Sequence, residues 1–192
     1  MNAAWRARAI LANPSAEWTK IEKESGDPAY LLTSYVALLA LIPAVFGFVG
    51  ACIVGAAMPG GRIVRAPIFD GAFGAVFGYV MTCGIVLVLG LVIDLLAPMF
   101  GGRRDFASAF KLAVYSYTPV WLAGIFLLAP GLRFLGLTGF YGAYLLWLGL
   151  PQLMKSPRPT IGAYAGVIVA CACALTIATA AAQHALFGLA AF

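Results

Sequence analysis

The sequence predicts an all-α, polytopic transmembrane helical bundle of about five spans, preceded by a short amphipathic N-terminal segment. The first observation is composition: of 192 residues, 63% are hydrophobic and only 10% are charged, whereas a soluble domain carries roughly a quarter charged residues. The second is that the apolar residues form runs of about 20, the length that a helix needs to cross a bilayer. A soluble bundle with this composition would expose large apolar patches. Lipid is therefore expected to surround most of the chain.

The N-terminal segment, residues 1–29, is predicted to form short amphipathic helices on the cytoplasmic side. Asn13 is suited to cap a helix that begins at the next residue. Trp18 and Ile21 share one face of that helix, and Trp5 lies in an earlier piece that also carries arginines. Helices of this kind suit the lipid headgroup region, so these three residues are predicted to be interfacial anchors. A docking surface for a cytosolic partner is the alternative.

Five apolar runs follow, and the predicted spans lie near residues 31–58, 72–99, 112–129, 133–154 and 160–187. Breaks rich in proline and glycine separate them, at residues 59–61, 98–102, 130–131 and 157–159. The turn at 130–131 predicts that the third and fourth spans form an antiparallel hairpin. Pro119 interrupts the third span, so a re-entrant hairpin remains an alternative. The runs lack the period-two alternation of membrane barrels.

The distribution of cations predicts the orientation. The net charge of +5 is spread between apolar runs, not clustered on one face, so nucleic acid is not an expected partner. An N-terminus on the cytoplasmic side places there Arg6, Arg8, Lys20, Lys23, Arg103, Arg104, Lys111, Lys155 and Arg158. The opposite side receives only Arg62, Arg65 and Arg133. This bias follows the positive-inside rule and puts the C-terminus outside.

Asp94 is the most informative single residue, because it lies inside the second predicted span. An ionisable side chain at membrane depth is costly and is a functional candidate by default. Its position near the cytoplasmic end also lets it pair with Arg103, Arg104 or Lys111. We favour this structural interpretation over proton or ligand binding.

Tyr115, Tyr117 and Pro119 make the third span a second candidate. A proline inside a helix leaves one backbone carbonyl without its usual donor. Neighbouring hydroxyl groups can satisfy that carbonyl or line a polar pocket. A packed kink is favoured over a transport site.

The fifth span carries small residues at every fourth position, which lets two membrane helices approach closely. These residues are Gly162, Gly166, Ala170, Ala174, Ala178 and Ala182. Packing within the bundle is favoured over a seam between two copies of the chain.

The sequence contains no phosphate loop, dinucleotide fingerprint, nucleophile elbow or zinc-binding helix. We therefore expect no catalytic residues, metal ligands or cofactor. The leading prediction is a non-enzymatic membrane protein that organises the membrane or interacts with proteins. Its expected partners are membrane lipids, and other membrane proteins or a second copy of the chain are further candidates. The alternative is a small transporter or lipid translocase that uses Asp94 and the polar face of the third span.

The order of several segments resembles the Yip family of integral membrane proteins, named for interaction with Ypt/Rab GTPases. The segments are NPSAEW, IPAVFGFVG, DLLAPMFGG, AFKLAVYSYTPVWLAGI and YGAYLLWLGLPQLMKSP. The resemblance implies that residues 30–192 are a Yip-like transmembrane domain with five spans, a cytoplasmic N-terminus and an outside or lumenal C-terminus.

Eukaryotic Yip proteins act in vesicle traffic and carry a longer cytoplasmic N-terminal region. The short segment of this chain is similar to that of the bacterial branch, which implies a bacterial inner membrane. It also argues against binding of a Rab-type GTPase. The family supplies no catalytic residues to place on this sequence.

Overall fold

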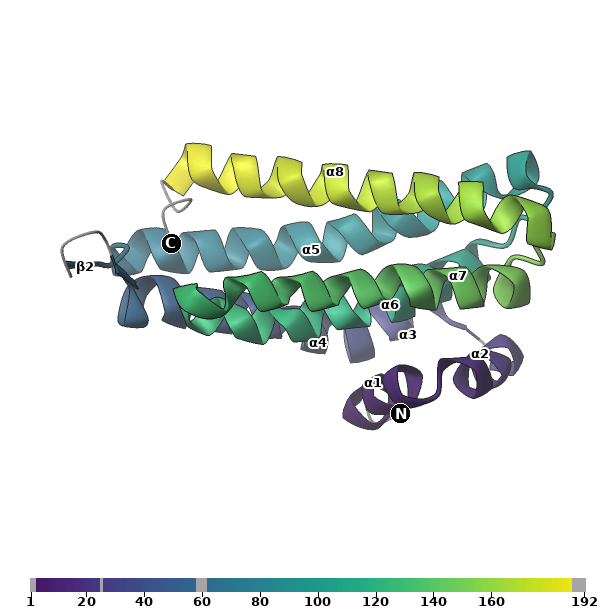
Figure 1. Cartoon of the computed structure of the whole chain (residues 1–192), viewed down its shortest axis with the longest axis horizontal. Coiled ribbons are helices and arrows are strands. Elements are labelled where there is room, and N and C mark those ends of the chain that lie inside the picture. The colour runs from purple at the N-terminus through teal and green to yellow at the C-terminus, as the bar shows by residue number, and fades with distance from the viewer. Residues whose placement is uncertain (1–2, 25, 58–61, 188–192) are drawn as a thin grey trace.

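The computed structural model describes residues 3–24, 26–57 and 62–187, which are almost entirely helical (Figure 1). The N-terminal part and the first span contain α1 (Ala3–Ala12), α2 (Pro14–Lys23), α3 (Pro28–Leu31), the π-helical η1 (Leu32–Val36), α4 (Ala37–Phe48) and the π-helical η2 (Val49–Val54). Two short strands follow, β1 (Ala56–Ala57) and β2 (Ile63–Val64). They pair antiparallel, with Ala56 opposite Val64 and Ala57 opposite Ile63.

The segment 68–187 contains the other four candidate spans. In order, it contains α5 (Ile68–Leu96), the 3-10 helix η3 (Ala97–Phe100), α6 (Phe106–Ala123), the 3-10 helices η4 (Gly124–Leu128) and η5 (Pro130–Phe140), α7 (Tyr141–Leu153), the 3-10 helix η6 (Arg158–Thr160) and α8 (Ile161–Phe187).

Five helical stretches among the described residues are long and apolar enough to cross a membrane, which confirms the predicted fold class. They are Pro28–Val54, Ile68–Phe100, Phe106–Leu128, Phe134–Leu153 and Arg158–Leu186. The predicted break at 59–61 and the predicted end of the first span at residue 58 lie outside the described residues.

Local sequence explains several helix boundaries. The side chain of Asn13 accepts a hydrogen bond from the backbone N–H of Ala16 at 3.4 Å, and a proline follows at the first helical position. Asp27 caps α3 in the same way, at 3.0 Å from the backbone nitrogen of Ala29. Gly101 closes η3 with a φ of 72°, a left-handed conformation that favours glycine.

The centre of the bundle is α6, in which every residue from 111 to 119 is buried. It contacts α5, α7 and α4. In Figure 1, α8 lies along α5 at one edge of the bundle, and α1 and α2 lie at the opposite edge. The third span carries several hydroxyl groups, and a central position lets them bond to other helices instead of facing hydrocarbon.

The predicted hairpin of the third and fourth spans is present, since α6 and α7 pack against each other. The helix α6 continues through Pro119, and η4 and η5 make the turn. The close approach of α6 and α7 depends on Gly142, because a Cβ atom there would overlap the carbonyl oxygen of Ser116. Glycine is thus required at this helix crossing.

Candidate functional site

The helices α1 and α2, residues 3–24, form a unit that we call the N-terminal cap, and it is packed along α7. Tyr141 at the start of α7 donates its hydroxyl to the carbonyl of Leu11, at 3.2 Å. Lys155, just after the end of α7, forms an ion pair with Glu22. Along α2, Trp18 approaches Gly149 and Glu22 pairs with Lys155, so α2 and α7 run side by side in the same direction.

Trp18 inserts from the cap into the bundle, and its side chain is fully buried. Its ring meets that of Tyr115 edge-on, with 6.2 Å between centroids. A Cβ atom at Gly149 would lie 2.9 Å from Cε2 of Trp18 and would overlap the side chain of Leu112. The glycine in α7 therefore provides the space that the indole occupies.

This geometry corrects the prediction that Trp18 and Ile21 are interfacial anchors. Both side chains are fully buried within the protein, because the apolar face of α2 packs on α6 and α7 and does not face a headgroup layer. Trp5, by contrast, is 55% exposed, and its anchoring role stays a prediction.

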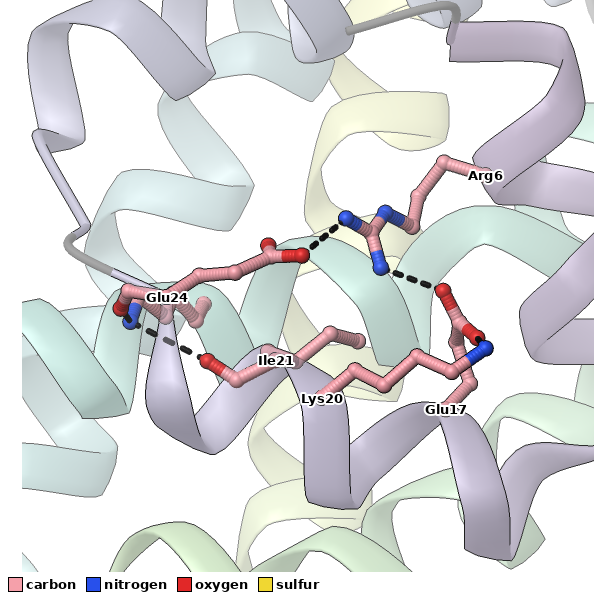
Figure 2. A network of polar contacts seen from close by, with 6 residues as sticks. Arg6, Glu17, Lys20, Ile21 and Glu24 are labelled. Carbon is pink, nitrogen blue, oxygen red and sulfur yellow. Dashed lines mark hydrogen bonds and ion pairs between the residues drawn. The ribbon is translucent and has the colours of Figure 1, made fainter.

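Arg6 joins α1 to α2 through a buried ionic network (Figure 2). Its guanidinium binds the carboxylates of Glu17 and Glu24, and Lys20 Nζ lies 3.0 Å from the second oxygen of Glu17. The side chains of Arg6 and Glu17 are only 5% and 3% exposed, whereas Glu24 is 41% exposed. Burial alone lowers the pKa of Arg6, but the hydrogen bond to Glu24 and the nearby carboxylates outweigh it, so the net pKa is raised.

Lys111 connects the end of α2 to the centre of the bundle. Its Nζ donates hydrogen bonds to the carbonyl of Ile21, at 3.3 Å, and to the carbonyl of Glu24. A cation at a helix C-terminus satisfies carbonyls that have no partner within the helix and complements the helix dipole. Lys111 was expected to flank the third span, yet it is part of α6 and is 7% exposed.

Tyr115 belongs to this joint between cap and bundle. Its ring lies 5.1 Å from that of Tyr35, and the guanidinium carbon of Arg6 is 6.0 Å from its centroid. The hydroxyl of Tyr35 in turn pairs with that of Thr118 at 2.9 Å. The tyrosine therefore supports the docked cap, and it lines neither of the two cavities described below.

Asp94 lies near the end of α5, and Arg104 Nη2 lies 3.3 Å from its Oδ2. This is one of the pairings that its position predicted. Its Oδ1 is buried, and nothing in the described part of the chain bonds to it. Asp94 lines neither of the two cavities described next, so the structure does not bring it together with Tyr117 into one pathway.

Two cavities lie beside α8, and Tyr117 borders both. The smaller one, which we call the narrow cavity, has a volume of about 370 Å³ and lies between α5, α6, η5, α7 and α8. The larger one, which we call the wide cavity, has a volume of about 680 Å³ and lies between α4, α5, α6 and α8. The Tyr117 hydroxyl is 3.3 Å from that of Thr176, another residue that borders both. Pro119 is buried in α6 and lines neither cavity.

The small residues of the fifth span do not pack inside the bundle, contrary to expectation. Gly162, Gly166, Ala170, Ala174 and Ala178 are all exposed. A Cβ atom at Gly166 would meet nothing within 4 Å, and one at Gly162 would only touch the ring of Trp147, at 3.4 Å. The face of α8 that carries Tyr164 and Ile168 turns inward instead.

Sequence reasoning missed the ionic network and the two glycines of α7. A signal for the network was present, since Glu17 and Ile21 lie on one face of α2 and Glu24, directly after the helix, continues their spacing. An acid on an otherwise apolar face predicts a buried cationic partner. The sequence offers no local signal that this partner is Arg6, in a different helix.

The comparisons with known proteins agree with the earlier resemblance. The Yip1 domain family matches residues 8–181, which include α2 and most of the last span. The inner membrane protein YohC of Escherichia coli strain K12 is 31% identical over 150 residues, or 76% of this chain and 77% of that protein. The protein of the same name from strain CFT073 matches to the same extent. No solved structure matches. The chain is a membrane protein with five candidate spans among its described residues, and it belongs to the Yip1 domain family.

Proposed function

We propose that this protein is a non-enzymatic organiser of a bacterial inner membrane, with its N-terminus in the cytoplasm and its C-terminus outside. The observation that carries the proposal is the docked N-terminal cap. Lys111 and Trp18 fasten the cap to the spans, and Arg6 holds the two helices of the cap together. The outer surface of the cap therefore keeps a constant position relative to the spans.

The outer surface of the cap is suited to anionic lipid headgroups. Trp5, Arg8, Lys20 and Lys23 are all exposed on it. Aromatic and basic side chains together favour the interface of a bilayer that contains anionic lipids. The positive-inside bias supports the same orientation.

Membership in the Yip1 domain family and similarity to the inner membrane protein YohC support a non-enzymatic role. Among residues 3–24, 26–57 and 62–187, no three His, Cys, Asp or Glu side chains come close enough to hold a metal ion. The buried ionic groups of the cap pair with one another.

The test measures enrichment of anionic lipid around the purified protein in vesicles of phosphatidylethanolamine and phosphatidylglycerol, by energy transfer to labelled phosphatidylglycerol. The variant Arg8→Gln/Lys23→Gln removes two exposed cap cations, and the control pair Arg8→Lys/Lys23→Arg keeps both charges. We expect the first pair alone to lower the enrichment, since each cation near a lipid surface contributes about 1 kcal/mol. An equal effect of both pairs, or none from the first, would contradict the proposal.

A further inference from the structure

The narrow cavity beside α8 has the properties of a binding site for a hydrocarbon chain. Its lining is almost wholly apolar, with Leu89, Leu146 and Ile168 from three different spans. At about 370 Å³ it is far larger than the packing voids of protein interiors, which rarely exceed a water molecule. A water there would need two to four polar partners, and an apolar lining provides few. Apolar cavities of this kind take apolar guests.

The position of the cavity decides which apolar guest can reach it. It lies between candidate membrane spans, with lining residues in both α7 and α8. These two helices contact each other far less extensively than α8 contacts α5. Membrane lipid surrounds the protein at this depth, so an acyl chain of a lipid is the apolar guest that can reach the cavity. A second helix is too wide, since its diameter with side chains is about 10 Å.

One polar atom inside the narrow cavity lacks a partner. Ser116 lines it, is 8% exposed, and its Oγ bonds to nothing among the residues that the structure describes. A buried hydroxyl without a partner is costly. An occupant with an ester or hydroxyl oxygen at that depth would satisfy it.

The wide cavity adjoins the narrow one, since the two share lining residues, and its lining is more polar. Tyr117 and Thr176 border both, while Thr179, Gln183 and His184 face the wide one. Neither cavity is lined by a described Asp, Glu, Lys or Arg. This arrangement matches an amphiphile whose head group is zwitterionic or uncharged.

We propose that the two cavities beside α8 form one binding site for a membrane lipid, with an acyl chain in the narrow cavity and a zwitterionic head group in the wide one. Tyr117 and Thr176 lie where the two parts of the lipid meet. The site is independent of the N-terminal cap, which lies on the opposite edge of the bundle (Figure 1).

The experiment uses the full chain in vesicles that contain phosphatidylethanolamine with a diazirine on one acyl chain. After irradiation, mass spectrometry maps the adducts on α8. We expect adducts on Val169, Ala172 and Thr176, which line the narrow cavity, in excess over the outward residues Ala170 and Ala174. Equal labelling of the two faces would show ordinary contact with bulk lipid and overturn the proposal.

Filling variants test the site directly. Ala172→Phe fills the narrow cavity, and Ala174→Phe adds the same ring to the exposed face of α8. The first should lower the adduct yield at Val169 at least about tenfold, equivalent to ~1.4 kcal/mol of binding free energy, and the second should leave it unchanged. If Ala172→Phe does not fold, Ser116→Leu fills the cavity from α6. An unchanged yield in a folded filling variant would refute the proposal.

Two further probes identify the head group, namely phosphatidylglycerol and a free fatty acid that carry the same diazirine. Preference for phosphatidylethanolamine supports the zwitterionic assignment. Equal labelling by phosphatidylglycerol, or labelling by the fatty acid alone, would overturn it.

Discussion

Replacement of Arg6 by methionine is expected to undock the N-terminal cap, because it leaves the carboxylate of Glu17 buried without its main partner. The Glu17 side chain is 3% exposed, and Lys20, 59% exposed, remains within 3.0 Å of it. Glu24 is 41% exposed, so water can hydrate it once Arg6 is gone.

The magnitude follows from these environments. Removing one member of a buried ion pair costs about 3–5 kcal/mol. The remaining contact with Lys20 favours the lower end, so we expect ~3 kcal/mol for Arg6→Met. The variant Arg6→Met/Glu17→Met removes both charges, and apolar replacement of a whole buried pair is often neutral or stabilising. It should lie within ~1 kcal/mol of the parent protein.

The assay is amide hydrogen exchange of residues 3–24 in lipid nanodiscs, which reports the free energy of local opening. A loss of ~3 kcal/mol corresponds to exchange that is over about a hundredfold faster. Arg8→Met is the control, since Arg8 is exposed and surface substitutions usually change stability by less than about 0.5 kcal/mol. Equal exchange in Arg6→Met and Arg8→Met, or no recovery in the double variant, would refute the reasoning.

Three other predictions concern the spans and their orientation. Gly142→Ala should lower the thermal unfolding temperature because its Cβ overlaps the carbonyl of Ser116. A Cβ atom at Gly166 would lie in open space, and alanine is favoured over glycine in helices by about 1 kcal/mol, so Gly166→Ala should leave that temperature unchanged or raise it. An equal loss of thermal stability in the two glycine variants would contradict this prediction. Asp94→Asn should cost less than about 1 kcal/mol in thermal unfolding, because its partner is 56% exposed; a larger loss would mean that the buried Oδ1 matters. A reporter enzyme active only outside the cytoplasm should work when fused to the C-terminus, and an inactive fusion beside an active cytoplasmic reporter would reverse the orientation.

The sequence by itself determined the five spans of this protein and the start of one of its N-terminal helices. The five spans follow from long apolar runs, and the start of α2 follows from its N-cap residue Asn13 and the proline after it. These features depend on residues that are neighbours in the chain, so local composition and helix chemistry suffice to predict them.

Only the tertiary structure decided which faces are inside. In a membrane, lipid and protein interior are both apolar, so hydropathy cannot distinguish a helix face that meets lipid from one that meets another helix. For that reason the small residues of α8 were assigned to the bundle, although they are exposed. The same holds for Trp18, whose burial requires Gly149, and for Glu17, whose main partner lies in another helix. The cavities beside α8 likewise exist only through the way in which separate spans pack.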